Sequence, residues 1–281
     1  LTGFQKTTCY KKSFWVGQSL AIGWNSDPTC STENKIGGKA ARLSTLYRAG
    51  FLVPNGFVIY ENNSNNARKF KDVFIESSVK TFLANTTQFA VRSSAPDEDK
   101  ISESKAGYYD SFLSVSGDKL YEAILACAET MFLRGASSPC VLIQPMIEGY
   151  ASGVAFLPNL LSNRQDQILV EVEKGNGGVV EGHSTPQRFL CRYQDGQPER
   201  IDLLQTIQPT SFDNDYRKPT ICEALLSPQQ LYRLVQLLKE TEKVFSFPLD
   251  VEWVLANDGT LFILQVRPLL STQSSQPTIV P

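Results

Sequence analysis

Three stretches of the chain place apolar residues at helical spacing. The first runs from Ala40 to Ala49 and stops at Gly50, so Gly37-Gly38-Lys39 lies at a helix N-terminus. The second follows Asp118, which we expect to cap it, and stops at Gly135. The third begins at Ser227-Pro228-Gln229-Gln230, a capping box with proline at the first helical position. The expected buried stripes of the second and third helices are Leu120, Ile124, Cys127 and Met131, and Leu231, Leu234, Val235, Leu238 and Phe245.

Short runs rich in β-branched and aromatic residues alternate with these helices. Residues 57–60 and 88–92 are predicted to be strands. Three more strands are expected in the runs at 141–147, 152–157 and 168–173, which should form one sheet and lead into a glycine loop at 174–182. This alternation of helices and strands predicts α/β or α+β lobes.

Residues 249–268 carry the strongest local signal. Asp258-Gly259 stands between two apolar-rich runs, a sequence typical of a two-residue hairpin turn. A hairpin closed by that turn determines which residues of the two strands face each other. The expected pairs are Asn257 with Thr260, Glu252 with Gln265, and Asp250 with Arg267.

Side chains alternate between the faces of a strand, so the pairs Glu252–Gln265 and Asp250–Arg267 share one face. A carboxylate and an amide oxygen beside an arginine can hold a hard cation and a phosphate, which suits Mg²⁺ and a nucleotide. Alternatively, this face is simply exposed to water, and Asp250 and Arg267 form a surface ion pair. The opposite face is expected to contribute Val251, Trp253, Leu255, Phe262, Leu264 and Val266 to the core.

Two other segments are candidates for phosphate contacts. The helix start at Gly37-Gly38-Lys39 offers backbone N–H groups and one ammonium. It is not a Walker A motif, because Glu33 stands where that pattern needs glycine and Ala40 where it needs serine or threonine. Arg92-Ser93-Ser94 places a guanidinium and two hydroxyls at a strand end. By themselves, however, the first segment is more typical of a helix-entry turn and the second of a solvated strand end.

Composition excludes several classes of protein. The 27 Lys+Arg and 29 Asp+Glu residues give a net charge of −2, which argues against a nucleic-acid partner. Polar residues interrupt every apolar run before about 18 positions, and residues 1–19 lack the pattern of a secretory signal, so no membrane partner is expected. The six cysteines form no Cys-x-x-Cys pair and are expected to be reduced thiols of a cytoplasmic protein. With His183 as its single histidine, the chain cannot build a multi-histidine metal site.

Taken in order, these segments resemble the nucleotide-binding domain of the phosphoenolpyruvate synthase and pyruvate phosphate dikinase family, a branch of the ATP-grasp fold that also serves rifampin phosphotransferases. The similar segments are 36–59, 89–99, 106–115, 141–156, the glycine loop with Thr185-Pro186, and DVEW at 250–253 with LQVRP at 264–268. The resemblance implies an α+β ATP-grasp fold, with two lobes of mainly antiparallel sheet and ATP in the cleft between them. The expected lobes are residues 1–145 and 146–270, followed by a linker or tail at 271–281.

The resemblance also implies roles for individual residues. Arg92, Glu252, Gln265 and Arg267 would be catalytic, with Glu252 and Gln265 holding Mg²⁺. The implied contacts with ATP come from Lys39, Arg92 and Arg267 on the phosphates, from the backbone between Gly107 and Ser111 as a lid, and from a hinge of Gln144, Pro145, Met146 and Ile147 against adenine.

The implied activity is ATP-dependent phosphotransfer of the dikinase type, which yields AMP and phosphate. The acceptor would be a phosphohistidine domain, on a separate or removed segment, or a small molecule. The chain departs from the family in its glycine loop: the family usually has Gly-Leu-Gly-Glu there, whereas GNGGVVEG is one residue shorter and lacks that glutamate. In addition, no histidine-bearing domain is seen in the residues after Pro268. The alternatives are a nucleotide-binding module without catalysis and a direct kinase or ligase acting on a small molecule.

Overall fold

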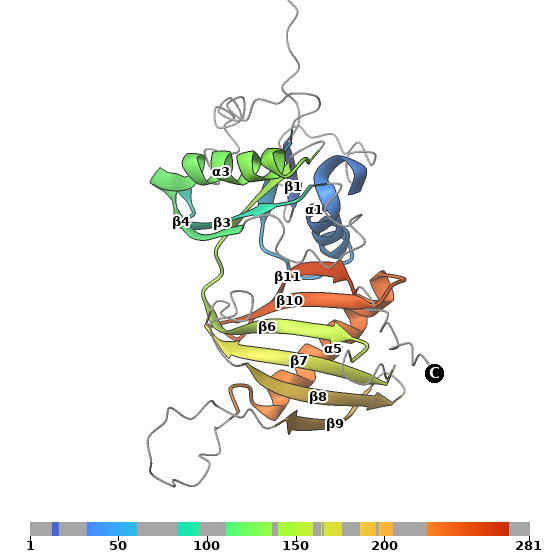
Figure 1. Ribbon diagram of the computed structural model, residues 1–281. Coiled ribbons are helices and arrows are strands. Elements are labelled where there is room, and N and C mark those ends of the chain that lie inside the picture. The colour runs from blue at the N-terminus through green and yellow to red at the C-terminus, as the bar shows by residue number, and fades with distance from the viewer. Residues whose placement is uncertain are drawn as a thin grey trace, which may run out of the picture.

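The computed structural model describes residues 13–16, 33–60, 84–95, 111–136, 140–159, 164, 166–175, 186–194, 197–204 and 224–269. These residues form two β-sheets in which every pair of neighbouring strands is antiparallel, and helices pack against both sheets (Figure 1). The structure thus confirms the predicted α+β class with mainly antiparallel sheets.

The first sheet has the strand order β1-β2-β5-β3-β4. Helix α3, Leu120–Leu133, covers one of its faces, with its apolar stripe buried against Phe89 and Val91 of β3. The strands are β1 Ser13–Val16, β2 Gly56–Tyr60, β3 Gln88–Ser93, β4 Ser111–Ser116 and β5 Cys140–Pro145.

The second sheet has the strand order β11-β10-β6-β7-β8-β9, and α5, Pro228–Val244, lies across one face of it (Figure 1). The chain passes from the first sheet to the second between Pro145 and Gly149. The prediction that the runs at 141–147, 152–157 and 168–173 form one sheet is therefore wrong, because the first run pairs with β2 and β3 in the first sheet and only the other two lie in the second. The strands are β6 Gly149–Leu157, β7 Gln167–Lys174, β8 Gln187–Gln194, β9 Gln197–Leu204, β10 Leu249–Ala256 and β11 Leu261–Pro268.

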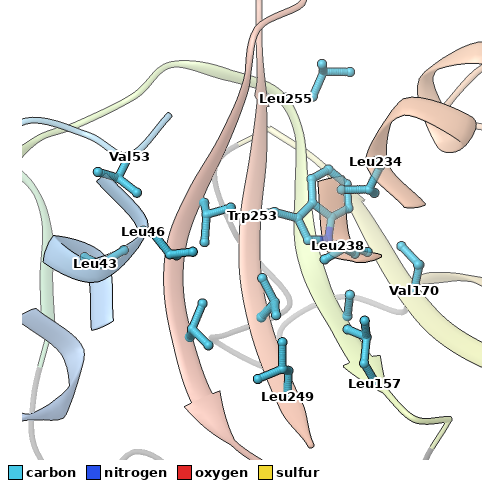
Figure 2. Close-up of a cluster of buried hydrophobic side chains, with 14 of the residues drawn as sticks. Leu43, Leu46, Val53, Leu157, Val170, Leu234, Leu238, Leu249, Trp253 and Leu255 are labelled. Carbon is cyan, nitrogen blue, oxygen red and sulfur yellow. The ribbon is translucent and has the colours of Figure 1, made fainter. Parts of the chain in front are cut away.

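Helix α5 begins with the predicted capping box. The Ser227 hydroxyl accepts a hydrogen bond from the Gln230 N–H at 3.2 Å, and the Ser227 N–H donates to Oε1 of Gln230 at 2.8 Å. Leu234 and Leu238 of this helix lie beside the Trp253 ring of β10 in the core of the second sheet (Figure 2). The cap and the apolar stripe together hold α5 against this sheet.

Helix α3 begins differently from the prediction. Asp118 lies inside a 3₁₀ turn, Gly117–Lys119, and the residue at the N-cap of α3 is Lys119, which makes no capping side-chain bond. The carboxylate is instead hydrogen-bonded by Ser116, which lowers the pKa of Asp118 below its ordinary value. The predicted cap is therefore wrong because a separate turn takes up this residue, whereas the stop at Gly135, with φ of 83°, is confirmed.

Helix α1, Glu33–Arg48, joins the two sheets. Its buried Leu43 and Leu46 belong to a core that also contains residues of both sheets, and Figure 2 shows them on the side of the β10–β11 hairpin away from α5. Nε of the buried Arg42 donates to the carbonyl of Val266 in β11 at 2.6 Å. Apolar packing and this hydrogen bond fix the helix to the second sheet.

The start of α1 crosses the backbone of the first sheet at Gly37. This residue has φ of 77° and ψ of 160°, so the helix is interrupted there and the regular turns begin after it. A Cβ at Gly37 would lie 1.7 Å from the carbonyl oxygen of Ser94. The Ser94 hydroxyl accepts from the N–H of Ala40 at 3.1 Å and donates to the carbonyl of Ile36 at 2.7 Å, so Ser94 caps the interrupted helix.

Other sequence expectations concern the membrane and the cysteines. Within the described ranges, no helix has the length and apolar character needed to cross a membrane. Cys127, Cys140 and Cys191 are buried and form no disulfide among the described residues, and burial raises the pKa of the Cys191 thiol to about 12. These three thiols are therefore part of the core.

Replacing Gly37 by alanine tests the close crossing. Gly37→Ala is expected to lower the free energy of unfolding by about 2 kcal/mol or more, because the new Cβ adds a clash with Ser94 to the cost of a positive φ. Gly50→Ala is the matched control, since Gly50 has φ of 88° and no atom within 4 Å of its Cβ position. Equal losses for the two variants in urea unfolding would contradict the crossing.

Candidate functional site

One face of the second sheet lies away from α5 and carries polar residues. The core face of β10, β6 and β7 holds the apolar set that includes Val251, Ala155 and Val170. Because strand residues alternate, the residues between them point to the opposite face. On that face Asp250 is the partner of Arg267, and Glu252 is the partner of Gln265, as predicted. We call it the site face.

The hairpin reaches this register by a different route from the predicted one. The Gly259 N–H donates to the Ala256 carbonyl at 2.9 Å, and Ala256 pairs with Thr260, so the loop has three residues and ends in Gly259 at φ of 83°. The predicted pairing of Asn257 with Thr260 is wrong. A β-bulge beside Glu252 then shifts the register by one residue and restores the predicted pairs at the site.

The bulge changes which apolar residues face the site. Phe262 and Leu264 were expected in the core. Instead, Ile263 is fully buried in the core, and the partly buried Leu261 packs against the same core. Phe262 instead pairs with Val254 on the site face. This correction follows from the one-residue shift, which exchanges the two faces of β11 between the turn and the bulge.

Glu252 is the centre of the charged groups on the site face. Its side chain is 8% exposed, and its two oxygens accept hydrogen bonds from Nη1 of Arg92 at 3.2 Å and from Nη2 of Arg267 at 3.1 Å. Arg92 belongs to β3 of the first sheet, whereas Glu252 and Arg267 belong to the second. Two guanidinium groups from different sheets thus meet on one buried carboxylate.

Asp250 lies next to this cluster and is destabilised as an anion. Burial raises its pKa from 3.8 to about 6; the charge of Arg267 opposes this shift and that of Glu252 adds to it. Nε of Arg267 lies 3.3 Å from Oδ2 of Asp250, while Oδ1 has no hydrogen-bond partner among the described residues. The cluster can therefore vary its charge near neutral pH.

Lys39 lies near the end of β3, as Arg92 does, but it contacts Ser93. Its side chain is buried, and Nζ donates to the hydroxyl of Ser93 at 3.2 Å. Ser93 and Arg92 are successive strand residues and point to opposite faces of β3. The structure therefore brings Lys39 to the end of β3, where it contacts Ser93.

A pocket extends from Arg92 along the site face, and its walls come from both sheets. All four residues of the predicted hinge line it, and Nε2 of Gln144 is tied to the Pro54 carbonyl at 2.9 Å. The pocket has about 400 Å³ of space that opens to solvent. Its lining residues are Pro54, Ala90, Arg92, Leu113, Gln144, Pro145, Met146, Ile147, Ser152, Val254 and Leu264.

The remaining predicted site residues are placed as follows. Ser111, the exposed first residue of β4, is the partner of Arg92 across the sheet. Gly107 and His183 lie outside the described residues, as does the glycine loop beyond Gly175. The structure thus brings together Arg92, Ser111, the hinge, Glu252, Gln265 and Arg267.

Sequence reasoning missed Leu264 and Ser152 as pocket residues. Leu261 to Leu264 are four apolar residues in a row, which leave the facing of the strand undetermined and could have indicated a bulge. Ser152 could have been found by alternation, since it is a polar residue in an apolar strand and the register partner of Val254.

Comparisons with known proteins agree with this geometry. Residues 67–281 match the family described as pyruvate phosphate dikinase, AMP/ATP-binding domain, which confirms the resemblance identified from the sequence.

Three relatives illustrate the range of proteins that contain such a segment. The prodigiosin synthesizing transferase of Serratia marcescens is 26% identical over 90% of this chain and 33% of its own length. A probable phosphoenolpyruvate synthase of Methanocaldococcus jannaschii is 22% identical over 91% and 27%, and the rifampicin phosphotransferase of Bacillus subtilis is 26% identical over 83% and 34%. The chain therefore spans about a third or less of each relative.

Among solved structures, the D-alanine–D-alanine ligase of Bacillus anthracis, in complex with ATP, resembles this chain. The sequence identity is 12%, the TM-score is 0.39, and the likeness covers 82% of this chain and 54% of the ligase. A score this low describes a distant likeness of architecture.

The pKa of Asp250 predicts how stability depends on pH. In the folded chain Asp250 keeps its proton up to about pH 6, whereas in the unfolded chain an aspartate releases it near pH 3.8. The free energy of unfolding therefore falls as the pH rises from about 3.8 to about 6. As the pH rises from about 4 to 7, the free energy of unfolding of Asp250→Asn is expected to increase by on the order of 2 kcal/mol relative to that of wild type. Urea unfolding at a series of pH values measures this difference.

Asp258→Asn is the control with the opposite sign. The Thr260 N–H donates to Oδ1 of Asp258 at 2.9 Å and lowers the pKa of this exposed turn residue. Its stabilising effect is present above the ordinary aspartate pKa and is lost as the pH falls through the lowered value. A pH-independent difference between wild type and Asp250→Asn would contradict the assignment of Asp250.

Proposed function

We propose, from the premise that this chain belongs to the pyruvate phosphate dikinase AMP/ATP-binding domain family, that it binds Mg·ATP between its two sheets and transfers phosphoryl groups. The observation that carries the proposal is the meeting of Arg92 and Arg267, from different sheets, on Glu252. Such a cluster joins positive charge from two sheets to a carboxylate at the end of a largely apolar pocket, an arrangement suited to the polyphosphate end of a nucleotide.

The adenine base occupies the end of the pocket away from Arg92. The hinge from Gln144 to Ile147 lines the pocket, as do the apolar Val254 and Leu264 of the second sheet. Apolar walls with a few polar groups are typical of sites for planar ligands. The N–H of Met146 donates to the Gln88 carbonyl at 2.9 Å, so the hinge is itself fixed to the first sheet.

The residues at the other end fit Mg²⁺. Glu252 and Gln265 are register partners, both are buried, and they offer a carboxylate and an amide oxygen. Mg²⁺ prefers oxygen ligands and usually takes only one or two carboxylates together with water and phosphate oxygens. When bound there, it neutralises charge on the terminal phosphates.

The arginines change partners when the nucleotide binds. In the structure both guanidinium groups are paired with Glu252. Phosphate oxygens offer them stronger, bidentate contacts, and an arginine that turns to phosphate releases a carboxylate oxygen. Arg92, Arg267 and Lys39 then hold the phosphates, and Ser111 contributes from the strand next to Arg92.

The acceptor lies outside the part of the relatives that this chain spans. We infer that it is a histidine on another segment or chain, or a small molecule, and that the protein acts in the cytoplasm without a membrane or nucleic-acid partner. The division into lobes 1–145 and 146–270 with a linker after them belongs to the same proposal. It is supported by the passage of the chain between the sheets at 146–148.

Calorimetric titration tests the binding site. The chain is expected to bind Mg·ATP, and Glu252→Ala with Gln265→Ala is expected to weaken binding at least about tenfold, because a charged ligand group is lost. Glu240→Gln, which removes an exposed carboxylate paired with Lys243 on α5, is the control and should leave the affinity unchanged. Equal affinity in the double variant and wild type would refute the site.

Product analysis tests the dikinase chemistry. Mg·ATP incubated with the chain and imidazole, a surrogate for a histidine acceptor, is expected to give AMP, phosphate and phosphoimidazole, because cations from both sheets reach the polyphosphate. The γ-phosphoryl group is transferred to water and the β-phosphoryl group to imidazole. Anion-exchange chromatography separates the nucleotides. ADP without AMP at every time point would indicate a simple kinase or ligase, and no turnover despite binding would indicate a nucleotide-binding module.

A further inference from the structure

On the site face, apart from the charged cluster around Glu252, two further buried polar groups beside the pocket have no hydrogen-bond partner in the part of the chain that the structure describes. They are Oε1 of Glu173 on β7 and Oγ of Ser152 on β6. The residues are 4% and 3% exposed, respectively. A buried carboxylate oxygen without a hydrogen bond is costly, so its presence in a site calls for a ligand that supplies a donor.

The two residues are neighbours and border the pocket. Ser152 and Glu173 are register partners on adjacent strands, and Ser152 lines the pocket next to Val254. Partners of this kind have Cβ atoms about 5 Å apart on the same face. Together they form a hydroxyl–carboxylate pair at the edge of the pocket.

The position of the pair along the pocket restricts what it can contact. Val254 is two residues from Glu252 on β10, a displacement of about 7 Å along the strand, and Ser152 lies beside Val254. The pair is thus displaced from the charged cluster along the strand direction, and Ser152 lines the same pocket as the hinge. In a nucleotide whose base lies at the hinge and whose phosphates lie at Arg92, the sugar is the part between them.

The chemistry of the pair matches the hydroxyl groups of a sugar. A carboxylate can accept two hydrogen bonds, and a serine hydroxyl both donates and accepts. A phosphate would be repelled by Glu173, and one carboxylate with one hydroxyl is a poor set for a second divalent cation. Vicinal hydroxyls satisfy both groups without adding charge.

We propose that Glu173 and Ser152 bind the 2′ and 3′ hydroxyls of the ribose and make the site specific for ribonucleotides. This inference rests on the proposed function, because it places the sugar by the base and phosphates of ATP. Glu173 acts as the acceptor for the two hydroxyls, and Ser152 orients one of them. The carboxylate gains in the complex the hydrogen bonds that the described residues do not give it.

The test compares the binding of Mg·ATP, Mg·2′-deoxy-ATP and Mg·3′-deoxy-ATP by calorimetry. The wild-type chain is expected to bind ATP about tenfold or more tightly than at least one deoxy analogue, as one hydrogen bond to a buried charge is lost. In Glu173→Ala and Glu173→Gln, the affinity for ATP should fall to that for the deoxy analogue, whose own affinity should change less than about twofold.

The matched control is Glu171→Gln. Glu171 lies two residues away on the same face of β7, but its carboxylate is paired with Nε of Arg188 at 2.7 Å. This variant should retain the wild-type preference for ATP. Ser152→Ala should reduce the preference partially, since it removes the weaker member of the pair.

Thermal unfolding provides a second readout. Because Oε1 of Glu173 has no partner in the described structure, Glu173→Gln should not lower the melting temperature of the nucleotide-free chain, but ATP should raise that temperature less than in wild type. If the wild-type chain binds ATP and both deoxy analogues with equal affinity, the ribose assignment is overturned but the proposed function is not. Full discrimination in Glu173→Ala does the same, whereas failure to bind any of the three nucleotides overturns the proposed function and the ribose assignment together.

Discussion

The site depends on one constraint, which is that the buried charge of Glu252 must be compensated. Water cannot solvate this carboxylate, and leaving it unpaired would cost several kcal/mol. Arg267 compensates it from the neighbouring strand, and Arg92 compensates it from the other sheet. The requirement therefore brings the two sheets together at the point where the pocket has its polar end.

Helix α1 keeps this arrangement in register. It is tied to the first sheet where Ser94 caps it at Gly37, and to the second where Arg42 bonds the carbonyl of Val266, one residue from Arg267. Packing of Leu43 and Leu46 adds the apolar contact that makes the connection rigid. The cluster around Glu252 is thus held by groups that do not themselves belong to it.

The sequence predicted β2, β3, β5, β6, β7 and the β10–β11 hairpin, the stripe and cap of α5, and the partners Glu252–Gln265 and Asp250–Arg267, because alternation and capping are local patterns. It did not predict β1, β4, β8 or β9. It also predicted the family, through the order of its motifs. It did not predict the contact of Arg92 with Glu252, which lies 160 residues away in the chain, because such contacts depend on how the sheets pack. The cap at Asp118 and the facing of Phe262 and Leu264 were wrong for local reasons, namely an extra turn and a bulge that the hydrophobic pattern does not encode.

The three-residue loop and the bulge offset each other. Each shifts the pairing of β10 and β11 by one residue, and beyond the bulge the two shifts cancel, so Glu252 and Gln265 remain opposite. Between the turn and the bulge only the first shift acts, and there Phe262 lies on the site face and Ile263 in the core. Inserting or deleting a single residue at the hairpin tip would therefore reverse the facing of this segment unless the bulge changed too. Insertions and deletions of loop residues, ordinarily the most tolerated changes in a protein, are coupled here to the composition of the site face. Among homologous chains, the length of this loop should therefore covary with the presence of the bulge.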